Sequence, residues 1–180
     1  TRLLASVAAQ PERCHVIGAY ALGKAQRVIR LIREAGHDAP IFLHGAQEKL
    51  CAYYASQGVE LGNLQKALDR DKAAFPGHIV IAPPSALRDR WSRRLPDPVI
   101  CQASGWMTIK QRAKQSGVEL PLVISDHADW NELTDTITAT GADTIWVTHG
   151  REDALVHWCR SRGLKAEPLY MQGREEDAGE

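Results

Sequence analysis

Two short polar segments, each containing a histidine, follow apolar runs of the chain that resemble buried β-strands. The first, Ser125–Asp129, reads Ser-Asp-His-Ala-Asp, and the second, Thr148–Gly150, reads Thr-His-Gly. A histidine at the end of a buried strand can point into a cleft, where imidazole acts as a general acid, a general base or a metal ligand. Because one helix and one strand fit between them, we predict that His127 and His149 reach the same edge of one sheet.

The polar residues around His127 have a structural explanation of their own. Ser125 or Asp126 would cap the helix that follows, and Asp126 and Asp129 would lie near its positive end. Capping leaves His127 unexplained. Neighbouring carboxylates favour the imidazolium form of His127, and a charged imidazole is a competent general acid.

The second segment predicts a metal ligand. Gly150 permits a tight exit from the strand, and a neutral imidazole at the position of His149 is a common ligand for metal ions. His157 stands eight residues further on, outside the four-residue spacing of a helical zinc pair. The pattern therefore offers one ligand rather than a set.

A third segment, Gly18–Lys24, fits the Gly-x-x-x-x-Gly-Lys spacing of a nucleotide phosphate loop. In such loops the next residue is Ser or Thr, whose hydroxyl binds magnesium, whereas this chain has Ala25. Nucleotide binding through Gly18–Lys24 is therefore the weaker alternative. Near a helix N-terminus, Lys24 can still contact a nucleic-acid phosphate.

The charge of the chain is balanced but unevenly distributed. Its 180 residues include 22 basic and 22 acidic side chains, so the net charge does not predict a nucleic-acid partner. The stretch Arg88–Lys114 holds seven basic residues and two acids. The basic residues are Arg88, Arg90, Arg93, Arg94, Lys110, Arg112 and Lys114. A solvated surface explains this stretch as well as a phosphate-binding surface does.

The cysteines and the apolar runs bound the class of protein. The four cysteines form no Cys-x-x-Cys pair, which argues against a zinc knuckle and favours reduced thiols in a cytoplasmic protein. No apolar run approaches the ~18 residues that span a bilayer, so we predict no membrane partner. Because the chain lacks an initiator Met and begins with a helical pattern, we expect it to be part of a longer protein.

Helical and strand patterns alternate along the chain and predict an α/β fold with a mostly parallel sheet. The predicted strands are 14–19, 41–43, 78–82, 98–103, 122–125, 144–148 and 166–170. The predicted helices are 1–10, 24–35, 47–56, 86–94, 130–140 and 153–162. We expect helix and loop at 60–74 and a polar connection at 110–117. The composition changes around 110–120, where we place a domain boundary.

Four segments, in their order along the chain, resemble the β-CASP branch of the metallo-β-lactamase fold, a group of metal-dependent nucleases of DNA repair and RNA maturation. They are Ala21–Gln26, Ala103–Met107, Ser125–Asp129 and Thr148–Gly150. The sequence looks most like the bacterial ligase-associated DNA exonucleases. The resemblance implies that 1–117 form the β-CASP lobe. Residues 118–172 would then return to the αββα metallo-β-lactamase domain, and 173–180 would form an acidic tail.

The resemblance also implies roles for particular residues. His127 matches the histidine that contacts the scissile phosphate or protonates the leaving oxygen, and His149 matches a ligand of one of two divalent metal ions, Zn or Mn. Nucleic acid passing between the lobes would meet basic side chains, namely Lys24, Arg88, Arg90, Arg93, Lys110 and Arg112. Supporting roles fall to Ser125, Asp126, Asp129 and Gly150.

The chain departs from the family pattern because the His-x-His-x-Asp-His motif and the other metal ligands are absent. Since a two-metal site works only when both ions are held, we predict that this chain alone is inactive and binds metal poorly. The predicted function of the whole protein is hydrolysis of DNA phosphodiesters by an exonuclease of DNA repair, in company with a DNA ligase system. An RNA-processing nuclease of the same fold and a non-catalytic nucleic-acid-binding lobe remain alternatives.

Overall fold

The computed structural model describes residues 2–171, except for the side chains of Arg112 and Met171. The predicted acidic tail, 173–180, lies outside this range. The chain divides into two compact units, Thr1–His127 and Ala128–Glu180. In the described range, every helix is too short or too polar to cross a membrane.

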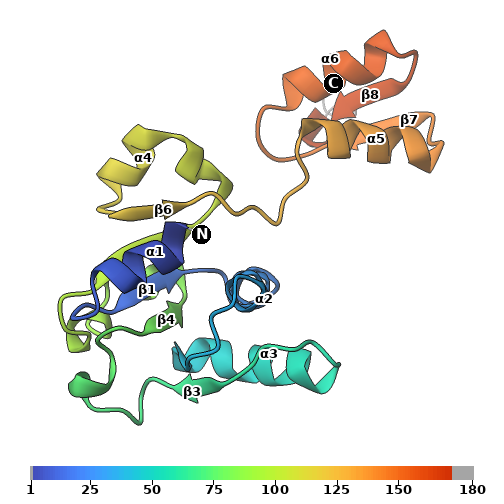
Figure 1. The fold of residues 1–180 in the computed structure, drawn as a ribbon. Coiled ribbons are helices and arrows are strands. Elements are labelled where there is room, and N and C mark those ends of the chain that lie inside the picture. Colours follow the sequence, from blue (N-terminus) through green and yellow to red (C-terminus); the bar gives the residue numbers. More distant parts are fainter. Residues whose placement is uncertain (1, 172–180) are drawn as a thin grey trace, which may run out of the picture. The chain divides into compact units, whose positions relative to one another are not determined.

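The first unit is built on a six-stranded sheet in the order β3-β2-β4-β1-β5-β6, with every pair parallel (Figure 1). Its strands are β1 (His15–Gly18), β2 (Ile41–Leu43), β3 (Leu64–Lys66), β4 (Ile79–Ala82), β5 (Val99–Ala103) and β6 (Leu120–Leu122). The central strands β1 and β4 are buried at every position, as expected of a parallel sheet covered on both faces. This architecture confirms the predicted α/β class with a mostly parallel sheet.

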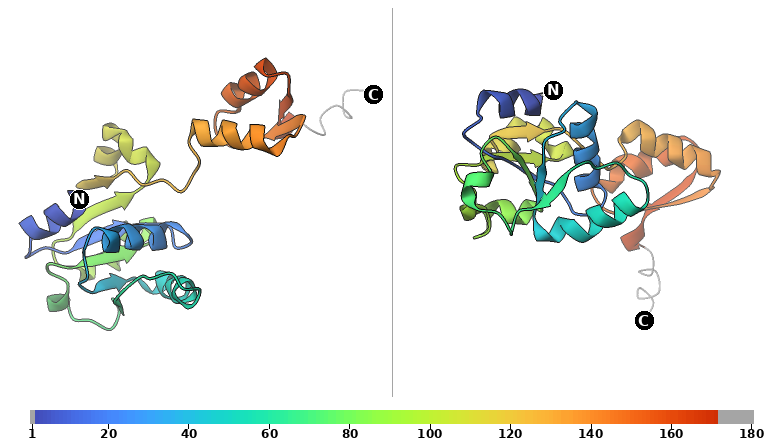
Figure 2. Two further views of the ribbon diagram at one scale, coloured as in Figure 1. Left: turned by 45° about the vertical axis from the view of Figure 1, so that its right-hand side comes forward. Right: turned by 60° about the horizontal axis from the view of Figure 1, so that its bottom comes forward.

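Three α-helices supply the apolar layer on one face of this sheet (Figure 2). They are α1 (Arg2–Ala9), α2 (Lys24–Glu34) and α3 (Gly45–Ser56). The apolar stripe of α2, formed by Val28, Ile29 and Ile32, packs in one cluster with Ile17 of β1 and Ile81 of β4. That stripe fixes the direction of α2 and therefore the position of its first turn.

Short 3₁₀ helices and loops cover the opposite face. These are η1 (Lys72–Ala74), η2 (Pro84–Arg88) and η3 (Ser92–Arg94). Around them, Phe75, Leu87 and Leu95 pack with Val16 and Val80 of the sheet. After β5 the chain forms η4 (Gly105–Thr108) and a short helix, α4 (Lys110–Gln115).

The second unit is much smaller. It contains α5 (Trp130–Thr140), β7 (Thr144–Val147), α6 (Glu152–Ser161), β8 (Lys165–Pro168) and η5 (Leu169–Met171). The two strands form a parallel sheet of their own. Five buried residues make its core, namely Ile137, Val147, Val156, Cys159 and Ala166.

One topological prediction is wrong. The strands before His127 and His149 do not belong to one sheet, because β6 pairs with β5 whereas β7 pairs with β8 in the second unit. Alternating strands and helices predict parallel pairing. They do not predict which sheet a strand joins, since that depends on packing between distant residues.

Several local predictions also differ from the structure. Residues 60–74 contain β3, a short edge strand whose Leu-Gln-Lys sequence is only partly buried and lacks the usual strand pattern. Residues 110–117 contain α4, and 86–94 form 3₁₀ turns rather than one helix. The strand expected at 122–125 ends at Leu122, with a proline inside it, which an edge strand tolerates. The predicted boundary at residue 117, between the β-CASP lobe and the metallo-β-lactamase domain, stays a prediction. Strand β6, which lies after this boundary, pairs with β5 of the first unit.

Candidate functional site at the carboxyl edge of the six-stranded sheet

The carboxyl edge of the sheet has a switch in topology between β1 and β5. From β1 the chain continues to β2 on one side, and from β5 it continues to β6 on the other. In open α/β sheets, ligands bind at the carboxyl ends of strands where such a switch occurs. Three of the four segments that carry the family resemblance follow β1, β5 and β6 at this edge.

The segment after β1 forms a tight turn that leads into α2. Gly23 has φ 77° and ψ −59°, a backbone conformation that a residue with a Cβ rarely adopts. The buried Gln26 donates from Nε2 to the carbonyl of Ala21 at 3.0 Å and so stabilises the turn. From α3, Gln47 donates to the carbonyl of Ala19 at 2.9 Å. The turn is therefore held by two buried amides.

The geometry of this turn disfavours a nucleotide phosphate loop. The backbone N–H groups of Lys24 and Ala25 donate to the carbonyls of Leu22 and Tyr20 at 2.9 and 3.0 Å. A phosphate loop needs such N–H groups to face its ligand. Because these donors are used within the turn, they do not point to nucleotide binding.

Lys24 is the first residue of α2, and its side chain is only 3% exposed. Its Nζ lies 2.7 Å from Oδ1 of Asp126 and 5.2 Å from the centre of the Tyr20 ring. The hydrogen bond from Lys24 holds the pKa of Asp126 below its usual range. A phosphate could take the place of Asp126 only if this ion pair opened, so the predicted nucleic-acid contact of Lys24 stays a prediction.

Hydrogen bonds fix the segment after β6 at Ser125 and at His127. Arg27 donates from Nη1 to the carbonyl of Ser125 at 2.6 Å. In turn, Ser125 Oγ accepts from the backbone N–H of His127 at 3.1 Å. Gly105, from the segment after β5, approaches so closely that a Cβ there would lie 3.3 Å from Ser125 Oγ. The three segments therefore meet in one place.

The imidazole of His127 is an accessible titratable group in this cluster. Its side chain is 84% exposed, and Nε2 lies 3.8 Å from Asp126 Oδ1. An exposed ring beside a fixed carboxylate can exchange protons with a bound molecule.

Asp129 belongs to the second unit and caps α5. Its Oδ1 accepts from the N–H of Glu132 at 2.9 Å, and Glu132 Oε2 accepts from the N–H of Asp129 at 3.0 Å. This reciprocal capping box replaces the predicted cap by Ser125 or Asp126, which is wrong. Those two residues are bound to α2 instead.

His149 follows β7 in the second unit and has an unusual backbone. Its φ is 67°, the left-handed region that residues with a Cβ rarely adopt, and Gly150 follows with φ 86°. The exposed ring has Nδ1 3.2 Å from Thr148 Oγ1. Among residues 2–171, no three His, Cys, Asp or Glu side chains are grouped so as to hold a metal ion. His149 alone therefore does not make a metal site, and its role as a ligand stays a prediction.

Most of the basic residues singled out from the sequence are exposed, and they follow strand ends at the same edge. Arg88 lies in η2, after β4, and donates to the carbonyl of Ser116 at 2.9 Å. Arg90 and Arg93 are exposed in the segment that follows, and Lys110 begins α4 after β5. The side chain of Arg112 is outside the described part of the chain.

Two cavities open at this edge. One, of about 530 Å³, is lined by Arg88, Gln102 and Ser116 among others. The other, of about 220 Å³, includes Tyr20 and Trp106 in its lining. Both have mixed polar and apolar walls, as expected for sites that orient a polar ligand.

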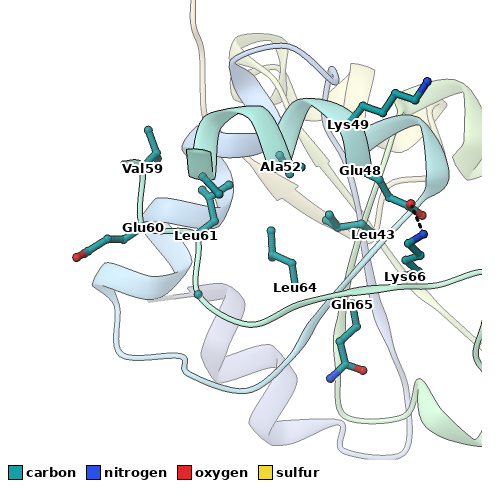
Figure 3. A pocket seen from close by; sticks show the side chains of 13 residues that line it. Leu43, Glu48, Lys49, Ala52, Val59, Glu60, Leu61, Leu64, Gln65 and Lys66 are labelled. Atoms are coloured by element: carbon teal, nitrogen blue, oxygen red, sulfur yellow. Dashed lines mark ion pairs between the residues drawn. The ribbon is translucent and has the colours of Figure 1, made fainter. Parts of the chain in front are cut away.

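A larger cavity, of about 680 Å³, lies away from the motif segments, between α3 and the edge strand β3. Figure 3 shows Leu43, Leu61 and Leu64 along its apolar wall, with the ion pair between Glu48 and Lys66 at one end. Its walls carry none of the residues predicted for the site. Size alone therefore does not locate the candidate site.

The sequence did not predict that Tyr20 and Arg27 belong to the cluster. It also did not predict the close approach of Gly105 to Ser125. Arg27 was detectable, because it stands three residues after Lys24 and so lies on the same face of α2. The other two depend on the approach of segments that are distant in sequence.

Comparisons with known proteins give one distant relative. No family model and no solved structure gives a significant match. The chain is 27% identical over 151 residues to a protein of Opitutus terrae named "Probable DNA ligase". The match covers 84% of this chain but only 14% of that protein. It is therefore a likeness to one segment of a much longer protein.

Proposed function

We propose that this chain is the C-terminal portion of a metal-dependent nuclease that hydrolyses the phosphodiester bonds of DNA. The main support is the meeting of three family-like segments at one sheet edge. Lys24 binds Asp126 and Arg27 binds Ser125, although about 100 residues separate the two segments. The fourth segment, with His149, lies in the second unit.

The choice of DNA over RNA rests on the distant relative. Its name refers to DNA, and the match extends over most of this chain. A nuclease that trims DNA ends prepares substrates for end joining, which fits the likeness to ligase-associated exonucleases. Exonuclease action in DNA repair, in company with a ligase system, is the form of the proposal that we favour.

The residues of the first unit would act on the nucleic acid directly. The exposed imidazole of His127 would contact the scissile phosphate or donate a proton to the leaving oxygen. Arg88, Arg90 and Lys110 would bind backbone phosphates. His149 would supply one nitrogen ligand. Because no three His, Cys, Asp or Glu side chains are grouped around a metal position in residues 2–171, His149 would need further ligands to hold the ion.

The test is digestion of end-labelled DNA and of RNA of the same sequence by the full-length protein, with manganese or zinc and with chelator. We expect metal-dependent release of label from DNA and a loss of at least ~100-fold in His127→Ala. His149→Ala should also abolish cleavage. His157→Ala, which removes an exposed histidine from α6, is the matched control and should cleave normally.

Three results would count against the proposal. These are no cleavage of either nucleic acid with metal bound, equal cleavage by His127→Ala and wild type, and preferential cleavage of RNA. A separate measurement concerns the 180-residue chain alone, which we expect to be inactive. A zinc content of two ions per chain after dialysis would contradict the expected poor metal binding.

A further inference from the structure

We infer that Lys24 is a positioning residue for His127 and acts through the carboxylate of Asp126, with Arg27 holding the adjoining backbone. The inference rests on the proposed function, because it concerns the role of His127 in cleavage. It extends that function to two residues of α2, Lys24 and Arg27.

Local energetics alone do not favour a lysine at position 24. The residue begins α2, where the helix dipole is positive and repels a cation. Its side chain is also almost completely buried, and burying a charge is costly unless it is paired. An apolar residue would avoid both penalties, so the stability of α2 does not account for Lys24.

Asp126 compensates the buried ammonium and at the same time faces His127. Its Oδ1 lies 2.7 Å from Lys24 Nζ and 3.8 Å from His127 Nε2. The same oxygen therefore lies between a buried cation and an exposed ring. Because the His127 ring is 84% exposed, little packing orients it, and the Asp126 carboxylate lies 3.8 Å from the ring.

Arg27 fixes the backbone on which His127 stands. It lies one turn after Lys24 on the same face of α2 and binds the carbonyl of Ser125 at 2.6 Å. The hydroxyl of Ser125 then accepts from the backbone N–H of His127. The first turn of α2 thus holds the two residues before His127, one by its backbone and one by its carboxylate.

Such positioning should affect the chemical step more than substrate binding. A general acid contributes in the transition state, and small displacements of a catalytic group cost large factors in rate. Loss of Lys24 releases the Asp126 carboxylate and allows it to swing with His127. We therefore expect kcat to fall while KM stays nearly constant.

The experiment compares kcat and KM for cleavage of labelled DNA by the full-length protein and its variants. Lys24→Met should lower kcat by ~10- to 100-fold and change KM by less than ~2-fold. Lys24→Arg should recover part of kcat because it keeps the charge. The double variant Lys24→Met with Asp126→Asn should be no worse than the poorer single variant, since the two act as one unit. Lys49→Met, an exposed lysine of α3, is the charge-removal control.

A second measurement does not require activity. In the 180-residue chain, Lys24→Met should shift the backbone amide NMR signals of Ser125, Asp126 and His127. Lys24→Arg should shift them less, and Lys49→Met should leave them unchanged. The signals of Ile79 and Ile81 in β4 report whether the sheet is intact. Unchanged signals at 125–127 would overturn the inference.

The outcomes separate this inference from the proposed function. If His127→Ala is impaired and Lys24→Met is not, the inference is wrong and the nuclease stands. If Lys24→Met raises KM without lowering kcat, Lys24 binds substrate and does not position His127. If His127→Ala cleaves normally, both the catalytic role of His127 and the inference are wrong.

Discussion

The two histidine-bearing segments are held in different ways, and they belong to units of different size. His127 stands at the edge of a six-stranded sheet, and the two residues before it are bound by side chains of α2. His149 follows a two-stranded sheet, and its own backbone takes the left-handed conformation. In the first unit, side chains of a neighbouring helix fix the loop before His127. In the second unit, the loop at His149 carries a disfavoured backbone conformation.

The largest expected effect tests whether the units differ in stability. Ile17 is fully buried in β1, so Ile17→Ala should lower the free energy of unfolding of the first unit by about 2–5 kcal/mol. Ile145→Ala, in the partly buried strand β7, should cost the second unit less. Hydrogen exchange in increasing urea measures the two units separately. Equal losses would show that the small core is as tightly packed as the large one.

The next effect concerns the ion pair that anchors the His127 segment. Asp126→Asn leaves the buried ammonium of Lys24 without its anion. It should cost about 2 kcal/mol, less than a fully buried pair because the carboxylate is partly exposed. Lys24→Met removes the buried charge itself and should cost less than Asp126→Asn. Urea denaturation of both variants shows which one loses more stability. A larger loss in Lys24→Met would show that the ion pair of Lys24 stabilises the unit by more than burial of its charge destabilises it.

The sequence predicted much of the first unit because its elements carry strong local patterns. Apolar runs such as 79–82 identify buried strands, and the apolar stripe of α2 identifies a helix whose bounds agree within a residue. The polar edge strand β3 and the basic helix α4 were missed. Both are short and weakly buried, so tertiary contacts decide their conformation.

The candidate site was predictable only in part. The positions of His127 and His149 after strands could be inferred from the pattern, and the pairing of Lys24 with Asp126 could not. That pair joins segments far apart in the chain, and it depends on β5 and β6 adding to one side of β1. The same long-range packing places β7 in another sheet, which local patterns do not encode.

A pH titration gives a further contrast within the first unit. Burial lowers the pKa values of His15, His37 and His44 below their ordinary value of about 6.5. The unfolded chain therefore binds more protons than the folded chain below pH ~6.5. The stability that these neutral rings contribute is complete above that pH and is lost as the pH falls through the lowered values. The urea midpoint of the first unit should decline between pH 7 and 5.

The variant His15→Gln should flatten this decline, because it removes one titrating group and keeps a partner for Ser6 Oγ, which lies 2.8 Å from His15 Nε2. His157→Gln, which lies in the second unit, is the control and should leave the decline of the first unit unchanged. The carboxylates with lowered pKa values, Asp126 and Glu119, lose their contribution only at more acidic pH and do not interfere. An unchanged slope in His15→Gln would mean that His15 binds protons equally in the folded and the unfolded chain.

The smallest effect tests whether the left-handed backbone conformation of His149 lowers the stability of the second unit. A residue with a Cβ at φ 67° is disfavoured, and glycine adopts this conformation freely. His149→Gly should therefore raise the free energy of unfolding of the second unit by up to about 1 kcal/mol, measured by hydrogen exchange. Asp97→Gly, at φ 38° in the first unit, is a comparison that also removes the ion pair of Asp97 Oδ2 with Arg13 Nε at 3.0 Å, so it should gain less. If His149→Gly destabilises the unit, the imidazole contributes more through its contacts, such as that with Thr148 Oγ1, than the backbone costs. A gain would instead indicate that the histidine is kept for its chemistry, as expected of a metal ligand.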